Sequence, residues 1–218
     1  REKLYNRVRQ LEQQVATLEN NIGFFSKSKG VESLIAEVED KIAKTKREIA
    51  DTIAKIKLII WDLDETFWEG TLSDGNHKLI KRNVQLIRDL TDCGIINSIC
   101  SKNEESEVLK VLDSAGLKDY FVFKSVNWTP KGERVKQIIS EMQLRAQNVL
   151  FIDDNNLNLQ EVKNACPDIM VESPKCINDL VEFFHNAEKK DIKHNRLNQY
   201  HVLEKKKESL AYLEGIVG

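Results

Sequence analysis

Apolar and polar positions along the chain follow three different patterns in turn. From residue 1 to about residue 55, apolar side chains recur at alternating spacings of three and four residues, in two runs separated by the polar segment 26–30. This spacing is typical of helices that pair along an apolar seam. It predicts an antiparallel helical hairpin over residues 1–55. Two helices cover such seams only in part, so a homo-oligomer or a partner helix is expected; the alternative is a solvated arm packed on its own body.

The middle stretch, residues 56–185, alternates strand-like and helix-like patterns. Apolar runs lie at 56–61, 95–100, 120–123, 149–152 and 169–171, and helical spacings lie between them at 83–93, 103–115, 130–142 and 156–165. Strands that alternate with helices predict βαβ units and a mainly parallel sheet, so we expect an α/β domain. In such sheets the reactive groups gather beyond the carboxyl ends of the strands.

The last stretch, residues 186–218, is charged and helix-prone, and we expect a peripheral helix that packs on the body or on the hairpin.

The 218 residues include 33 basic and 35 acidic side chains, a balance that gives no support for a nucleic-acid-binding body. The sequence has no run of about 18 apolar residues, so we expect no membrane span. Its four cysteines form no C-x-x-C pair and are expected to be buried, reduced thiols in a cytoplasmic protein.

Two carboxylates follow the first predicted strand. Asp62 comes directly after the run 56–61, and Asp64 lies two residues further on, where the chain turns. One carboxylate can attack phosphorus while the other protonates the leaving oxygen and later activates water. The alternative for such an Asp-x-Asp pair is a turn cap, because aspartate binds backbone amides well.

A hydroxyl and an amine occupy two later positions that suit phosphate. Ser101 follows the run 95–100 and can donate to a phosphate oxygen, although Ser101 and Glu104 also fit a helix capping box. Lys131 follows Pro130 at a predicted helix start and can neutralise charge on a transferring group, with a surface lysine as the alternative.

Two adjacent acids, Asp153 and Asp154, follow the fourth apolar run. Buried side by side they would repel each other, so a cation is expected between them and Asp62. The alternative is one capping acid and one solvated acid.

The order and positions of these residues resemble the four motifs of the haloacid dehalogenase (HAD) superfamily of aspartyl phosphotransferases. The motifs map onto Asp62-x-Asp64-x-Thr66, Ser101, Lys131 and Asp153-Asp154. The chain is also similar to the FkbH-like, subclass IIIC branch in the segments Asp62-Leu63-Asp64-Glu65-Thr66-Phe67-Trp68-Glu69-Gly70, Cys100-Ser101-Lys102-Asn103, Asn127-Trp128-x-Pro130-Lys131 and Phe151-Ile152-Asp153-Asp154-Asn155. The resemblance covers residues 57–185 and implies a Rossmann-like, three-layer HAD core over 56–185, between the hairpin and a helical extension over 186–218.

The resemblance implies a role for each motif residue. Asp62 would be the nucleophile that becomes an aspartyl phosphate, and Asp64 would be the general acid and base. The phosphoryl group would be held by Thr66, Ser101 and Lys131.

The same resemblance implies Mg²⁺ as the cofactor. Its ligands would be the Asp62 carboxylate, the Asp64 backbone carbonyl and an acid of the fourth motif. For that acid we favour Asp154, with Asp153 in support.

Little chain is left for a lid over this site. Only a short flap, at about 67–77, fits between the first two motifs, and no lid domain fits between Ser101 and Lys131. We therefore expect a minimal cap and an open site that admits a bulky or protein-bound substrate. Trp68 is expected either to line the site as a wall or to be a core aromatic. The other candidates for a substrate-facing rim are Lys102, Asn103, Asn127 and Trp128.

These expectations combine into a Mg²⁺-dependent phosphomonoester hydrolase that acts on a phosphorylated small molecule or on a carrier- or protein-bound substrate. Some FkbH-like proteins instead transfer a glyceryl unit from a phosphorylated glycerate to a carrier protein. That reaction would benefit from a thiol such as Cys100, but strand alternation points Cys100 away from the face used by Ser101. A third alternative is a non-catalytic docking module built on the helical hairpin.

Overall fold

The computed structural model describes Gln13, Thr17 and residues 29–217. It divides the chain into two units, Arg1–Lys55 and Ile56–Gly218. In the first unit, helix α2 spans Lys29–Ile53, where the second run of the expected hairpin lies. The first run lies almost wholly outside the described residues, so the hairpin and its self-association stay predictions.

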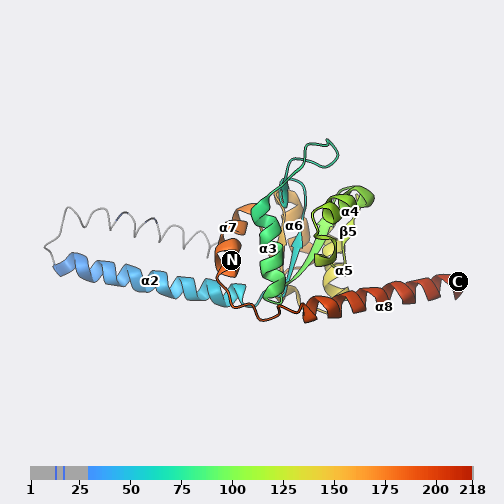
Figure 1. Ribbon diagram of the computed structural model, residues 1–218. Coiled ribbons are helices and arrows are strands. Elements are labelled where there is room, and N and C mark those ends of the chain that lie inside the picture. Colours follow the sequence, from blue (N-terminus) through green and yellow to red (C-terminus); the bar gives the residue numbers. More distant parts are fainter. Residues whose placement is uncertain (1–12, 14–16, 18–28, 218) are drawn as a thin grey trace. The chain divides into compact units, whose positions relative to one another are not determined.

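A five-stranded sheet forms the centre of the second unit (Figure 1), and its neighbouring strands are parallel. The strand order is β5-β4-β1-β6-β7, so the first strand of the domain lies in the middle of the sheet. The α/β fold with a mainly parallel sheet that the alternating pattern predicts is confirmed. The strands are β1 (Leu58–Trp61), β4 (Ile96–Ser101), β5 (Ser125–Val126), β6 (Val149–Ile152) and β7 (Met170–Glu172).

Helices cover both faces of the sheet. On one face α5 (Lys131–Glu141) packs beside α6 (Asn156–Ala165), and on the other α3 (Lys81–Asp92) packs beside α7 (Ile177–His185). α4 (Glu105–Ser114) follows β4 and precedes a 3₁₀ turn at Lys118–Tyr120. The result is the three-layer arrangement that buries a parallel sheet on both sides.

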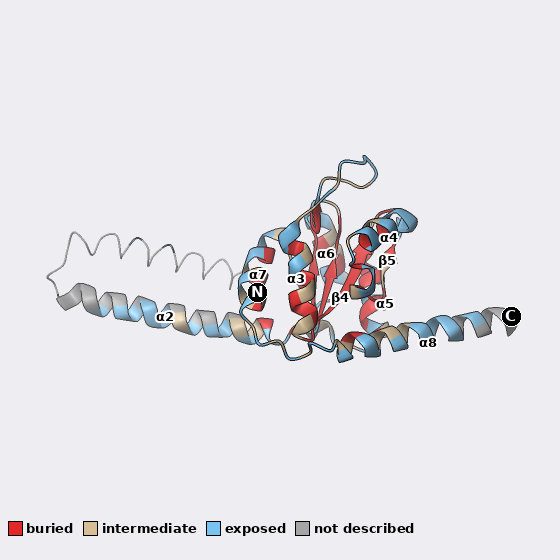
Figure 2. Cartoon of the chain, viewed as in Figure 1, coloured by how far each residue is buried: buried red, intermediate tan, exposed pale blue. Residues whose placement is uncertain are grey.

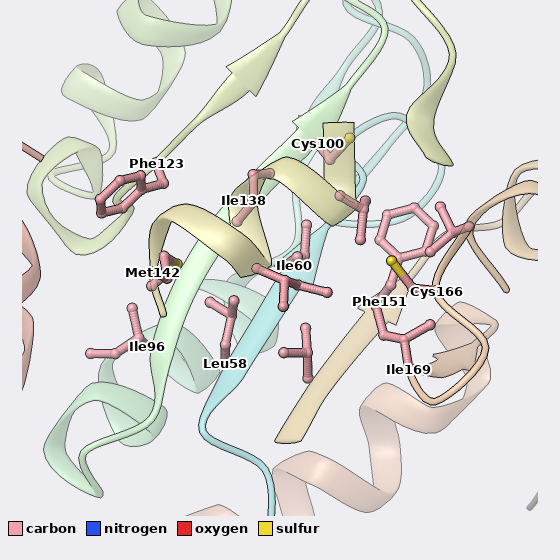
Figure 3. Close-up of a cluster of buried hydrophobic side chains, with 14 of the residues drawn as sticks. Leu58, Ile60, Ile96, Cys100, Phe123, Ile138, Met142, Phe151, Cys166 and Ile169 are labelled. Carbon is pink, nitrogen blue, oxygen red and sulfur yellow. The ribbon is translucent and has the colours of Figure 1, made fainter. Parts of the chain in front are cut away.

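The core beneath α5 and α6 is built from alternate strand residues, because successive side chains of a strand point to opposite faces. Figure 3 shows these side chains gathered under α5, and Figure 2 shows the same strands as the most deeply buried part of the domain. Burial of this apolar surface is the main stabilising contribution that holds the strand ends in place. The cluster includes Leu58, Ile60, Ile96, Cys100, Phe123, Ile138, Met142, Phe151, Cys166 and Ile169.

One expected strand, at 120–123, is misplaced. Phe121 makes only an isolated bridge to Asn97, and the paired strand β5 follows at Ser125–Val126. Phe123 accounts for the shift, because its φ of +50° is left-handed and interrupts the extended backbone. Its amide donates to Glu204 Oε1 at 2.6 Å instead of to a neighbouring strand.

The region after residue 186 ends in helix α8 (Asn195–Val217). Its first half packs on the sheet domain, since Leu197 is buried in the core cluster and Glu204 accepts the Phe123 amide. Further along the helix, Leu210 and Tyr212 are exposed. Among the described residues, no helix combines the length and apolar character that crossing a membrane requires.

Between Asp64 and the start of β4 the described chain holds only α3 and a two-stranded hairpin, which we call the flap (68–79). In the flap, β2 (Trp68–Glu69) pairs antiparallel with β3 (Lys78–Leu79). The loop between them, teal in Figure 1, projects beyond the sheet. The cap over the carboxyl edge of the sheet is therefore small.

The flap loop depends on one glycine more than on the other. Gly70 has a φ of +77°, and a Cβ there would lie 2.7 Å from Asn76 Oδ1 and 2.8 Å from the Asn76 carbonyl oxygen. Gly75 is also left-handed at +68°, but its Cβ would meet nothing within 4 Å. We expect Gly75→Ala to cost about 1 kcal/mol of flap stability from backbone strain alone, and Gly70→Ala to cost clearly more. Hydrogen exchange of the flap amides measures both, and equal exchange in the two variants would contradict the packing of Gly70 against Asn76.

Candidate active site

The register of the sheet brings the motif residues to one edge. Trp61 pairs with Ile99 of β4 and with Ile152 of β6. Asp62, which directly follows β1, therefore lies close to the end of β4 and beside Asp153, which directly follows β6. Because parallel strands end at the same edge, residues far apart in the sequence meet there.

Lys131 joins two of these strand ends. Its Nζ donates to Asp62 Oδ1 at 2.5 Å and to Asp153 Oδ2 at 2.6 Å. Pro130 is the N-cap of α5 and Lys131 is its first residue, so the side chain extends from the helix start toward the sheet. The Lys131 side chain is buried, which rules out the surface-lysine alternative.

The charges of this buried group do not balance. One ammonium lies between two buried carboxylates, and an uncompensated charge in a protein interior is costly. Burial raises the pKa of Asp62 to about 6 against the attraction of Lys131, and Asp153 adds repulsion. Burial alone would lower the pKa of Lys131, but the two carboxylates outweigh burial and raise the pKa. The group is therefore short of one positive charge.

A third acid stands beside this group at the surface. Asp154 is exposed, and desolvation together with repulsion from Asp153 raises the pKa of its carboxyl. Asp62, Asp153 and Asp154 each offer one carboxylate oxygen, and the three oxygens lie within 4.8 Å of one another. A set made only of carboxylate oxygens suits a hard divalent cation such as Mg²⁺. The donor chemistry and the missing positive charge both fit such an ion.

Asp153 and Asp154 are held differently. Asp153 Oδ1 accepts the Asn155 amide at 2.9 Å, and the Asn158 amide group donates to both Asp153 oxygens at 3.1 and 3.2 Å. The alternative of one capping acid and one solvated acid thus describes part of the arrangement, but Asp153 also binds Lys131. With both its oxygens already hydrogen-bonded, Asp153 is the less available of the two acids.

Ser101 is the last residue of β4 and donates its hydroxyl hydrogen to Asp62 Oδ1 at 2.9 Å. The capping-box alternative is wrong, because α4 has Glu104 as its N-cap and no side-chain cap hydrogen bond. Thr66 is also buried, and its Oγ1 accepts the Asp154 amide at 3.0 Å. Both hydroxyls thus lie against the acidic group.

The Asp64 carboxylate is fastened by three donors. Its Oδ1 accepts from Trp68 Nε1 at 2.8 Å and from the Leu72 amide at 3.1 Å. Its Oδ2 accepts from Asn103 Nδ2 at 3.1 Å, and the same amide nitrogen donates to Ser101 Oγ at 3.2 Å. A continuous hydrogen-bonded path therefore runs from Asp62 through Ser101 and Asn103 to Asp64.

Two residues that the sequence suggests for a substrate rim lie inside the fold instead. Trp68 is fully buried and Asn103 is 3 % exposed. Trp68 is thus a core aromatic, whose ring packs near Phe67 and His77 and whose nitrogen holds Asp64. Asn103 is hidden because it bridges Asp64 and Ser101.

The other rim candidates remain at the surface. Lys102 is half-buried, and its Nζ lies 3.4 Å from Asn158 Oδ1. Asn127 and Trp128 are exposed, and the Asn127 amide donates to the Ser101 carbonyl oxygen at 3.2 Å. These three residues border the edge of the sheet that carries Asp62.

Two further residues support the site and are not among those singled out from the sequence. Asn158 holds Asp153 from the first turns of α6, as described above. Arg134 is buried, and its guanidinium donates to the Ser101, Ser125, Asn127 and Thr129 carbonyl oxygens and to the Ser125 hydroxyl. For Arg134 the sequence did offer one indication: it lies three residues after Lys131, so both side chains share one face of the predicted helix.

No protein-family model matches the chain, and no curated protein matches it. Among solved structures, the N-terminal part of a Bacteroides fragilis protein, which contains a phosphatase domain complexed with Mg, matches with a TM-score of 0.57. Its sequence identity is 22 %, over 70 % of this chain and 47 % of that chain. This chain thus spans about half of the length of the Bacteroides structure.

Two other solved structures match less closely. A Legionella pneumophila hydrolase of HAD subfamily III A has a TM-score of 0.49 and 15 % identity, over 73 % of this chain and 98 % of that chain. The 3-deoxy-D-manno-octulosonate 8-phosphate phosphatase of Moraxella catarrhalis has a TM-score of 0.43 and 18 % identity, over 53 % of this chain and 67 % of that chain. Of these three matches, the Bacteroides structure shows that the chain shares the fold of that domain.

The charge imbalance predicts an unusual effect of Asp62→Asn on stability. The pKa of Asp62 is higher in the folded than in the unfolded chain, so its contribution favours folding below about pH 4 and is lost as the pH rises through about 6. Asparagine can still accept from Ser101 and Lys131 but carries no charge. In EDTA we expect the variant to match the parent at pH 4 and to exceed it by up to about 3 kcal/mol at pH 8. Urea denaturation measures the free energy of unfolding of parent and variant at each pH. A parent at least as stable as the variant at pH 8 would refute the charge imbalance around Lys131.

Proposed function

We propose that the chain is a Mg²⁺-dependent phosphomonoester hydrolase of HAD type that works through an aspartyl phosphate on Asp62. The observation that carries this proposal is the bridge from Lys131 to Asp62 and Asp153 at the carboxyl edge of the sheet, with Asp154 exposed beside it. The FkbH-like, subclass IIIC assignment belongs to the same proposal and rests on the motif segments alone.

Mg²⁺ is the proposed cofactor, and the Mg-bound phosphatase domain from Bacteroides, which shares the fold, supports it. Asp62, Asp154 and the Asp64 backbone carbonyl would hold the ion, while Asp153 would steer Lys131 and stay hydrogen-bonded to Asn158. When bound, Mg²⁺ would supply the missing positive charge and polarise the phosphoryl oxygens.

In the first half-reaction, a carboxylate oxygen of Asp62 attacks phosphorus and the bond from phosphorus to the leaving oxygen breaks. Asp62 Oδ1 accepts from Ser101 and Lys131, which fixes the orientation of the carboxylate and leaves Oδ2 for attack. Protonated Asp64 gives its proton to the leaving oxygen, so the products are an alcohol, an aspartyl phosphate and an ionised Asp64.

In the second half-reaction, Asp64 takes a proton from a water molecule that attacks phosphorus. The acyl-phosphate bond breaks, which returns the Asp62 carboxylate and releases inorganic phosphate. Thr66, Ser101 and Lys131 would hold the phosphoryl oxygens in both steps. In the resting structure the Ser101 hydroxyl hydrogen points to Asp62, so it would turn to the phosphoryl group on binding.

Glyceryl transfer through a thiol at this site is less well supported. Cys100 is fully buried in the core cluster, as the strand alternation predicts. Burial raises the pKa of its thiol to about 11, so almost no thiolate forms near neutral pH. The intact acidic site likewise gives no reason to prefer a purely docking role.

The proposal predicts that Asp62→Asn abolishes hydrolysis of p-nitrophenyl phosphate in Mg²⁺. Without the carboxylate no aspartyl phosphate forms, so we expect kcat to fall by roughly 10³-fold or more. A matched control is Asp113→Asn, which removes an exposed acid on α4 and should leave kcat unchanged. Phosphate release measures both, and activity that survives in Asp62→Asn would remove Asp62 as the nucleophile.

The anchoring of Asp64 predicts a leaving-group effect for Trp68→Phe. The change removes the indole donor to Asp64 Oδ1 and so misplaces the general acid. Phenyl phosphate has a more basic leaving oxygen than p-nitrophenyl phosphate and needs that proton more. We expect kcat/KM to fall about tenfold more for phenyl phosphate. The ratio of kcat/KM for the two substrates does not depend on how much of the protein is folded. An unchanged ratio in Trp68→Phe would show that Trp68 does not contribute to acid catalysis.

A further inference from the structure

Trp128 differs from the other two tryptophans of the chain. Trp61 and Trp68 are fully buried, whereas Trp128 is 67 % exposed. An indole is among the largest apolar side chains, and leaving it in water forgoes the stabilisation that burial would bring. The indole of Trp128 is therefore accessible to another molecule.

The loop that carries Trp128 is held in place rather than free. Arg134 NH1 donates to the carbonyl oxygens of Asn127 at 2.9 Å and Thr129 at 3.1 Å. Asn127 Oδ1 accepts from the Thr129 amide at 3.0 Å and from the Thr129 hydroxyl at 2.6 Å. The backbone on both sides of Trp128 is therefore fixed, and the exposure of its ring does not come from a loose loop.

Both ends of this loop are attached to the candidate active site. At one end the Asn127 amide donates to the carbonyl oxygen of Ser101, whose hydroxyl binds Asp62. At the other end the chain reaches Lys131, which binds Asp62 and Asp153. Trp128 is therefore carried on a rigid border of the site that holds the nucleophile.

Exposed apolar side chains elsewhere in the described residues have a different distribution. Of the six large ones, four lie in or just before α8: Ile192, Val202, Leu210 and Tyr212. The other two are Trp128 and Leu157, which follows Asp154 by three residues on the first turn of α6. Away from α8, exposed large apolar groups thus lie next to the motif residues in the sequence and in the fold.

We propose that Trp128 determines substrate specificity by stacking its indole face on the leaving group, so that the site prefers phosphomonoesters of alcohols that carry an aromatic or flat apolar group. This inference rests on the proposed phosphatase function and names its substrate class. Because the backbone that carries the indole is already fixed, only the two side-chain torsions of Trp128 lose freedom on contact, which makes stacking efficient. The small flap leaves the border that bears Trp128 open to such a group.

Paired substrates test the proposal by kinetics. Benzyl phosphate and ethyl phosphate both lose an alkoxide, but only the first carries a ring. For Trp128→Ala we expect KM for benzyl phosphate to rise about three- to tenfold, with KM for ethyl phosphate and both kcat values unchanged. Trp128→Phe should restore most of the affinity for benzyl phosphate. Tyr212→Ala, which removes an equally exposed ring on α8, should change neither substrate.

The result that would overturn the proposal is a KM for benzyl phosphate that is unchanged in Trp128→Ala, or one that rises equally for both substrates. The first outcome would show that Trp128 does not contact the leaving group, and the second would show that the substitution damages the site in general.

A binding measurement decides the question separately from turnover. Because the other two tryptophans are buried, iodide quenching of fluorescence reports on Trp128. With Mg²⁺ present, we expect benzylphosphonate to shield Trp128 from iodide and methylphosphonate to leave it accessible. Benzylphosphonate that binds without shielding Trp128, or does not bind, would overturn the proposal. If no phosphomonoester is turned over, the proposed function fails, and the shielding result still tests Trp128.

Discussion

The structure depends on one buried ammonium placed between two buried carboxylates. Lys131 holds Asp62 and Asp153 together across the carboxyl edge of the sheet, and its single charge cannot balance both acids. Proteins rarely keep such an imbalance unless a proton or a cation completes it. Burial raises the pKa of Asp62 and repulsion from Asp153 adds to the rise, while the exposed Asp154 beside it offers the oxygen that a cation would need.

The fold explains how this group is kept rigid. β1 lies in the middle of a parallel sheet and is buried on both faces, so Asp62 extends from the central strand of the domain. Helix α5 presents Lys131 from its first residue, and Gly132 allows close packing on α6, where an added Cβ would lie 3.1 Å from the Ala165 Cβ. Arg134 then ties the helix to the ends of β4 and β5. Lys131, Gly132 and Arg134, all in the first turns of α5, thus connect the site to the scaffold.

The periodic patterns of the sequence predicted most of the strands and helices of this domain. The helix expected at 156–165 has the bounds of α6, and the motif residues at the strand ends meet because parallel strands end together. The strand expected at 120–123 is interrupted at Phe123, whose φ is left-handed and whose amide binds Glu204, far along the chain. The sequence offered only a spacing for Arg134, and the importance of both Arg134 and Asn158 lies in partners that only the folded chain supplies. The sequence likewise did not decide whether Trp68 lines the site or lies in the core, because its burial and its hydrogen bond to Asp64 arise only in the tertiary structure.

The most direct test of the central constraint is calorimetric titration of Mg²⁺ into the metal-free protein in buffers of different ionisation enthalpy. If Asp62 holds a proton in place of the ion, binding near pH 6 releases about half a proton per Mg²⁺, and the release disappears by pH 8. Binding without any proton release at pH 6, or no binding at all, would contradict a buried group that is short of one positive charge.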